Sequence, residues 1–302
     1  IGSDRLPAVI AAIRERIISL GGKFLWDSRV ERIEGGESFR AVHLADGTRI
    51  EAPAALIACG HSARPLIEAL SKLIAFQMKG FQLGCRIEHP QSFINRIQYG
   101  METPCPALGA AEYLFSTHGT DVIPGATSFC MCPGGEIIPA TCEEGTLATN
   151  GMSESARSGK FANSAIVSTL PPDLFATPAE AFAFLRGLEA SLFEKGGGNY
   201  TCPAQNAHDF LECKSGRLPH ESSYRLGLRQ SRLDNLVPEP TRSALANALR
   251  RFDRLAPGFI RHGLLVGMET RVSSPVRFLR DPETLASSMP GLWLGGEGGG
   301  MA

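Results

Sequence analysis

The chain has 302 residues, of which 43% are hydrophobic and 20% are charged, so a packed core is available and global disorder is not expected. Its 30 basic and 31 acidic residues are spread out without a long Lys/Arg cluster, which argues against a nucleic-acid or membrane partner. The 8 cysteines lack regular spacing, no apolar run reaches membrane-spanning length, and no signal peptide precedes the first helix. We therefore expect a reduced, cytoplasmic protein.

The first predicted element is a helix over residues 4–20, because its apolar residues recur at intervals of three and four and Gly21-Gly22 ends it. A β pattern follows, with an Asp46-Gly47 hairpin signal before its last strand. Its strands are predicted at residues 24–33, 41–44 and 48–50. Ala54–Ala58 is a continuous apolar run, which predicts a strand buried on both faces that ends at Cys59-Gly60-His61.

From about residue 75 to 270 the pattern changes to short strands, many prolines and two predicted helices, at residues 178–195 and 239–255. Strands such as Gly84–Ile87 and Ser128–Cys132 do not alternate with helices in a regular βαβ order. We therefore expect a mixed α+β insertion within an α/β framework. A last short apolar strand is predicted at Gly291–Leu294.

Glycine is frequent, at 33 residues, and its densest run, Gly295–Gly300, directly follows that last strand. Open α/β sheets bind nucleotides at such strand ends. The run does not match the dinucleotide pattern G-x-G-x-x-G, because Met301 stands where the third glycine is needed, so a plain glycine-rich turn is the alternative. Within the run, Glu297 offers carboxylate oxygens that accept hydrogen bonds from ribityl or ribose hydroxyls.

Two other motifs point to different chemistry. Residues 59–64 resemble a nucleophile elbow but read G-x-S-x-R without the second glycine, which makes a hydrolase a weak alternative. Cys130 and Cys132 share one face of a predicted strand, so both thiols can point into one pocket. A C-x-C pair without further partners is a poor zinc signature, and we predict no metal site. A thiol-redox or metal-binding protein centred on these cysteines stays an alternative.

Arginines stand near the ends of several predicted strands. Arg86 lies in a charged cluster with Glu88 and His89, and Arg271 and Arg277 bracket a serine- and proline-containing segment. The planar guanidinium group suits carboxylates and phosphates and stabilises an anionic cofactor or substrate. Ordinary surface ion pairing is the alternative for each arginine.

Eight segments, in matching order over nearly the whole chain, resemble a bacterial family of uncharacterised FAD-dependent dehydrogenases related to the glutathione-reductase-type flavoproteins. The segments are Ile13–Gly22 (IRERIISLGG), Leu56–Arg64 (LIACGHSAR), Gly84–Pro90 (GCRIEHP), Ser128–Gly135 (SFCMCPGG), Thr149–Ser153 (TNGMS), Gly196–Tyr200 (GGGNY), Gly267–Val276 (GMETRVSSPV) and Gly291–Gly298 (GLWLGGEG). Eight ordered segments are more specific than any single motif above. The resemblance implies FAD as the cofactor, hydride or electron transfer to an unidentified small-molecule substrate, and NAD(P)H as an electron donor.

The resemblance also implies a domain organisation. Residues 1–74 would form part of a Rossmann-like FAD-binding domain, residues 75–270 a large mixed α+β substrate-side insertion, and residues 271–302 the return to the FAD domain. Family members carry a βαβ unit with G-x-G-x-x-G before the point where this chain begins, and a helix after the closing glycines. We therefore expect an internal fragment that does not retain FAD by itself. A non-enzymatic alternative is a cofactor-free module that self-associates as a homo-oligomer.

Residue roles follow from the same resemblance. Val30 matches the position that contacts the adenine, Ala58-Cys59-Gly60 the turn beside the cofactor, and Gly296-Glu297-Gly298 the element that holds the ribityl chain. The segment Thr270–Arg277, which includes Ser274, would return toward the isoalloxazine ring. The candidate catalytic residues are Arg271, Arg277, Cys130 and Cys132.

Overall fold

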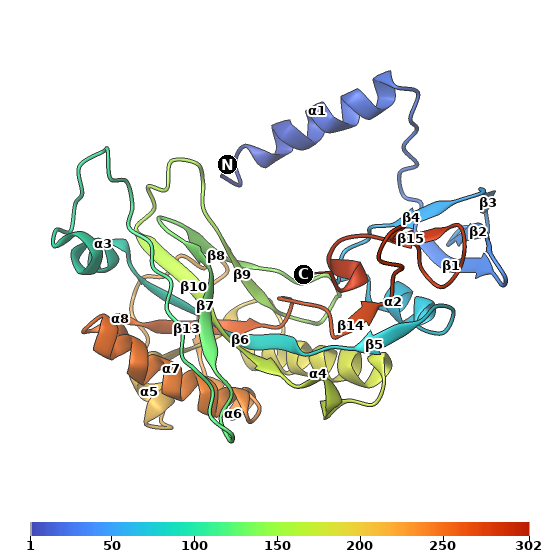
Figure 1. Ribbon diagram of the computed structural model, residues 1–302. Coiled ribbons are helices and arrows are strands. Elements are labelled where there is room, and N and C mark those ends of the chain that lie inside the picture. Colours follow the sequence, from blue (N-terminus) through green and yellow to red (C-terminus); the bar gives the residue numbers. More distant parts are fainter. Residues whose placement is uncertain (1, 302) are drawn as a thin grey trace. The chain divides into compact units, whose positions relative to one another are not determined.

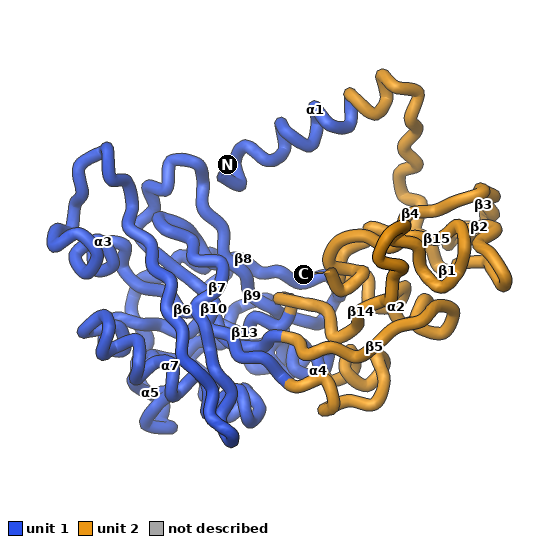
Figure 2. The backbone as a smooth tube through the Cα atoms, viewed as in Figure 1, with its two compact units in different colours: residues 1–15, 82–170, 185–270 blue, residues 16–81, 171–184, 271–302 orange. Residues whose placement is uncertain are grey.

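The computed structural model describes residues 2–301 as a mixed α+β fold (Figure 1). The chain divides into two compact units, each assembled from segments far apart in the sequence (Figure 2). Unit 1 takes the chain up to residue 15 together with residues 82–170 and 185–270. Unit 2 takes residues 16–81, 171–184 and those from 271 onward. The boundary at which unit 2 first gives way to the long segment of unit 1 lies between residues 81 and 82, whereas the sequence suggested 74/75. The final return to unit 2 lies between residues 270 and 271.

Unit 1 is organised around a six-stranded sheet. In spatial order its strands are β12 (Leu228–Gln230), β11 (Cys202–Asn206), β13 (Leu264–Glu269), β6 (Phe81–Pro90), β10 (Phe161–Leu170) and β7 (Ala126–Cys132). The β12–β11 pair is parallel, whereas β11–β13, β13–β6 and β10–β7 are antiparallel. Neighbours in the sheet are therefore mostly strands that lie far apart along the chain.

Helices and a hairpin cover this sheet. Helix α7 (Thr241–Leu255) packs on β10 and β7 because its apolar residues fall on one face. A hairpin of β8 (Glu136–Pro139) and β9 (Thr149–Met152) contacts β10, and β9 also contacts β7 and β13. The shorter helices are α3 (Gln91–Tyr99), α5 (Ala207–Leu211), α6 (Leu233–Leu236) and α8 (Phe259–His262). The longer helix α4 (Pro178–Gly196) has residues in both units.

Unit 2 contains three small sheets. The strands β1 (Val30–Gly35), β2 (Phe39–Leu44) and β3 (Arg49–Glu51) form an antiparallel meander. Strand β5 (Phe76–Met78) pairs antiparallel with β14 (Val276–Phe278), and β4 (Ala55–Ile57) pairs parallel with β15 (Leu292–Leu294). Helix α2 (Arg64–Leu70) and two 3₁₀ turns, η1 (Pro172–Leu174) and η2 (Glu297–Gly299), complete the unit.

The expected helices are present as α1 (Leu6–Ser19), α4 and α7, but two strand predictions were wrong in extent. Residues 24–29 are irregular, because Phe24 stacks on Trp26 at 5.6 Å and Asp27 turns the chain with a φ of 54°. The strand expected at 54–58 is only β4, and its central Leu56 is 67% exposed rather than buried. The apolar stripe of α1 is also exposed. Among residues 2–301, no helix has both the length and the apolar character needed to cross a bilayer.

Alternate side chains of β6 point to opposite faces of the sheet, and His89 enters an aromatic core. Its ring lies 4.2 Å from Phe259 and 5.6 Å from Phe93, measured between centroids. The Nε2 atom donates to the Phe259 carbonyl at 2.9 Å, so the neutral ring carries its lone pair on Nδ1. Burial lowers the pKa of His89 to about 4.

This burial predicts an acid-sensitive fold. As the pH falls from 6.5 toward 4, the unfolded chain binds a proton at His89 that the folded chain does not. The contribution of His89 to the free energy of unfolding should therefore fall by about 1.4 kcal/mol per pH unit, or about 3 kcal/mol in all. Denaturant unfolding of His89→Gln across this range should show a correspondingly shallower slope. Phe93→Leu perturbs the same core without removing a titrating group and should keep the wild-type slope; equal slopes for wild type and His89→Gln would contradict the assignment.

Candidate functional site

The parallel pair β4–β15 brings two distant chain segments to the same place in unit 2. Ala55 pairs with Leu292 and Ile57 with Leu294, and the Gly295 amide continues the ladder by donating to the Ile57 carbonyl at 2.9 Å. Parallel strands end at the same edge of a sheet, so residues 58–60 and 296–298 leave it together. The structure thus places side by side the two turns that the sequence identified separately.

Backbone packs directly on backbone between these turns. A Cβ atom at Gly298 would lie 2.8 Å from the carbonyl oxygen of Gly60 and 3.1 Å from its carbon, closer than side chains approach. Gly60 and Gly296 have φ values of 72° and 66°, a left-handed conformation that favours glycine. The close contact therefore requires glycine at position 298, and the left-handed backbone favours glycine at positions 60 and 296.

His61 connects the turns to a third segment. Its Nε2 atom donates to the carbonyl oxygen of Arg271 at 2.9 Å, and its Nδ1 atom lies 3.9 Å from Oε2 of Glu297. That Oε2 atom is buried without a hydrogen-bond partner, although the Glu297 side chain as a whole is 42% exposed. Desolvation lowers the pKa of His61, and its bond to the Arg271 carbonyl opposes this shift.

Two cations lie at the end of the same glycine run. Nζ of Lys79 and Nε of Arg277 donate to the Gly300 carbonyl at 3.3 and 3.4 Å. Burial lowers the pKa of Lys79, and the neighbouring Arg277 charge lowers it further. The carbonyl end of η2 therefore carries positive charge.

The predicted site residues fall into groups. Six of them lie on the two turns described above: Ala58, Cys59, Gly60, Gly296, Glu297 and Gly298. Arg271 lies on the third segment, which His61 contacts, and Arg277 lies at the end of the glycine run. Ser274 accepts a hydrogen bond from the Val276 amide at 3.2 Å and so shapes the turn before β14. Val30 begins β1 in the separate meander. The exposed Cys59 thiol has a raised pKa through partial burial.

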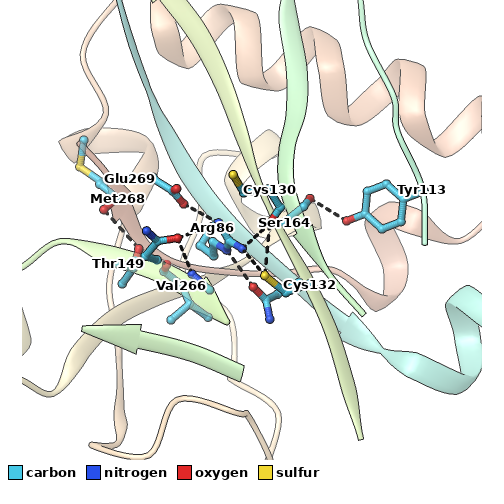
Figure 3. A network of polar contacts seen from close by, with 12 residues as sticks. Arg86, Tyr113, Cys130, Cys132, Thr149, Ser164, Val266, Met268 and Glu269 are labelled. Carbon is cyan, nitrogen blue, oxygen red and sulfur yellow. Dashed lines mark hydrogen bonds and ion pairs between the residues drawn. The ribbon is translucent and has the colours of Figure 1, made fainter. Parts of the chain in front are cut away.

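Cys130 and Cys132 belong to a different cluster, in unit 1, centred on Arg86 (Figure 3). Arg86 is fully buried, and its Nη1 atom donates to Oε2 of Glu269 at 2.9 Å across the β6–β13 pair. Its Nε atom donates to Oδ1 of Asn163 at 2.8 Å. Its Nη2 atom donates to the Cys130 carbonyl at 2.6 Å and contacts Sγ of Cys132 at 3.2 Å. The guanidinium donors are therefore used inside the unit, and Arg86 acts as a structural hub.

The sequence did not reveal the Arg86–Glu269 pair, although charges within two otherwise apolar strands were a usable signal. Glu269 is only 3% exposed. Desolvation raises its pKa, and the charge of Arg86 opposes that rise. Buried charges of this kind are found paired, because an isolated one is costly to desolvate.

The expectation that the two thiols share a face does not hold, because β7 contains a bulge. Cys132 lies opposite Asn163 and Phe129 opposite Ala165, so Cys130 and Met131 together face a single residue. Cys130 has a φ of 44°, an exposed side chain, and meets Arg86 only through its carbonyl oxygen. Burial raises the pKa of both thiols, which disfavours the reactive thiolate. Within residues 2–301, no three His, Cys, Asp or Glu residues are grouped closely enough to hold a metal ion.

Fold and site together define a mixed α+β protein with a glycine-lined turn at the ends of two parallel strands. Residues 80–272 match the family described as FAD-dependent protein, C-terminal domain-like, and the chain belongs to this family. It is 37% identical over 308 residues to an uncharacterized protein of Clostridium beijerinckii, covering 100% of this chain and 58% of that relative. The chain therefore spans little more than half the length of the relative it matches.

One solved structure matches most of the chain at low similarity. It is the crystal structure of CtdE in complex with FAD, which is 11% identical. The match covers 94% of this chain and 51% of that one, with a TM-score of 0.31.

Proposed function

We propose that this chain is part of an FAD-dependent oxidoreductase, in which unit 2 supplies one wall of a Rossmann-like FAD site and unit 1 is the substrate-side domain. The observation that carries the proposal is the pairing of two glycine turns at the ends of β4 and β15, in a chain whose family is described as FAD-dependent. Strand ends with close backbone approach are where α/β proteins bind nucleotides.

The residues at these turns fit an FAD molecule. Gly60 and Gly296 leave backbone uncovered by side chains, and the half-exposed Glu297 offers a carboxylate that accepts hydrogen bonds from ribityl hydroxyls. Lys79 and Arg277 supply positive charge at the end of the run. When bound, FAD supplies hydride or electron transfer. The chain's own residues bind and orient it, and NAD(P)H is the proposed electron donor for an unidentified small-molecule substrate.

Glu297 provides the first test of this proposal. Its replacement by alanine in the full-length protein should weaken FAD binding roughly 10- to 100-fold, the value of a hydrogen bond to a charged group. The dissociation constant can be measured from quenching of FAD fluorescence. Glu283, an exposed carboxylate in the same unit, provides a matched control, and Glu283→Ala should bind FAD like the wild type. Unchanged affinity in Glu297→Ala would remove Glu297 from the site.

The oxidoreductase class has its own test. Adding NAD(P)H anaerobically to the flavin-loaded full-length protein should bleach the visible flavin band. A colourless protein that does not take up FAD, and whose apparent size depends on concentration, would instead support the cofactor-free, self-associating module.

A further inference from the structure

Three segments that are far apart in the sequence of unit 2 meet at the imidazole of His61. The ring stands on the turn after β4, its Nε2 atom faces the carbonyl of Arg271, and its Nδ1 atom faces the carboxylate of Glu297 in η2. The side chain is 21% exposed, so the ring is held between these partners and is not free in solvent. Its position suits a residue that controls the geometry of both turns.

The two contacts of His61 require different protonation of its two ring nitrogens. A carbonyl oxygen only accepts hydrogen bonds, so Nε2 carries a hydrogen in either charge state. In the neutral ring Nδ1 then carries a lone pair, which faces the acceptor Oε2 of Glu297 and cannot bond to it. This explains why the 3.9 Å separation exceeds a hydrogen bond and why Oε2 is a buried oxygen without a partner. A proton on Nδ1 turns the contact into an ion pair.

We propose that His61 is a proton-dependent positioning residue, whose imidazolium form joins the Arg271 carbonyl to Glu297 and so orients the other Glu297 oxygen toward the cofactor. The inference rests on the proposed FAD site. Oε2 is buried against His61 while the Glu297 side chain remains half-exposed, so the outward oxygen is the one that reaches a ligand. Holding one oxygen fixes the rotamer of the carboxylate before the ligand arrives.

The charges around the ring decide the pH range of the effect. Glu297 favours the imidazolium, whereas Arg271, Arg64 and the partial burial of the ring oppose it. Because burial is the largest influence, His61 gains its proton below the ordinary histidine value of 6.5. The effect should therefore develop as the pH falls below 6.5.

The test is FAD binding by the full-length protein, measured by fluorescence quenching from pH 5 to 8. Wild-type protein should bind FAD about 3- to 10-fold more tightly at the acidic end, as expected for one added hydrogen bond. His61→Asn and His61→Gln should lose this pH dependence and bind at all pH values like wild type at pH 8 or more weakly. Circular dichroism and thermal unfolding of both variants identify any that do not fold. Because the asparagine and glutamine side chains differ in length, the second variant still tests the proposal if the first does not fold.

His43 offers a matched control, because its Nε2 atom also contacts a carboxylate of unit 2, Oε2 of Glu34, at 2.6 Å, but on the meander. His43→Asn should keep the wild-type pH dependence. A nuclear magnetic resonance titration gives a second readout, since by linkage FAD should raise the pKa of His61 by about 0.5–1 unit. If wild-type protein binds FAD but His61→Asn shows the same pH dependence of FAD affinity, the proposed role of His61 is contradicted and the proposed function stands. If wild-type protein binds no FAD at any pH, the proposed function itself is overturned.

Discussion

Replacing Arg86 by alanine is expected to lower the free energy of unfolding by about 3–5 kcal/mol, because it leaves Glu269 as a buried charge without its partner. The same change removes the donors that serve Asn163, the Cys130 carbonyl and Cys132. Chemical denaturation followed by circular dichroism measures the loss. Without the opposing charge of Arg86, desolvation should raise the pKa of Glu269 further, so the variant should lose relatively less stability in acid.

A double-mutant cycle separates the ion pair from its surroundings. Arg86→Met combined with Glu269→Leu should be less destabilising than the sum of the two single changes, with a coupling energy of roughly 0.5–3 kcal/mol. Lys160 forms an exposed ion pair with Glu221 in the same unit, so Lys160→Ala should change stability by less than about 0.5 kcal/mol. Additive single effects would show that Arg86 and Glu269 do not depend on each other.

Replacing Gly298 by alanine is expected to weaken FAD binding about 5- to 150-fold. The added Cβ atom would lie 2.8 Å from the Gly60 carbonyl oxygen, so one of the two turns must move, which costs about 1–3 kcal/mol. The same displacement should lower the unfolding temperature of the FAD-free protein, which gives a readout that does not depend on the cofactor. Both quantities can be measured on one preparation, by FAD titration and by calorimetry.

The adjacent glycine provides the control. A Cβ atom at Gly299 would have Leu294 Cβ as its nearest neighbour, at 3.4 Å, which is an ordinary contact. Gly299→Ala should therefore keep both FAD affinity and thermal stability close to wild type. If the two alanine variants behave alike, close packing against Gly60 is not the property that the turn requires.

Local patterns predicted the elements whose formation depends on neighbouring residues. Helix α7 follows from one apolar face, and β15 from a short apolar run that ends in glycines. Local patterns failed at residues 24–29, where the chain turns without regular spacing. They also failed at the β7 bulge, where one extra residue turns Cys130 away from the strand face that it was expected to share with Cys132. A bulge depends on the partner strand, which periodicity within one strand does not describe.

The candidate cofactor site shows the same limit. The turns at Cys59-Gly60 and Gly296-Glu297 are recognisable from composition and from family resemblance, because glycines after an apolar strand mark places where backbone approaches something closely. The sequence places His61 only at the end of a predicted strand, and its partner Arg271 lies 210 positions away. The Arg86–Glu269 pair spans 183 positions. Composition and periodicity thus indicated a mixed α+β fold and the chemical types present at the turns. Only the pairing of β4 with β15 and of β6 with β13 decided which side chains meet, because hydrogen bonds between strands join residues irrespective of their distance along the chain.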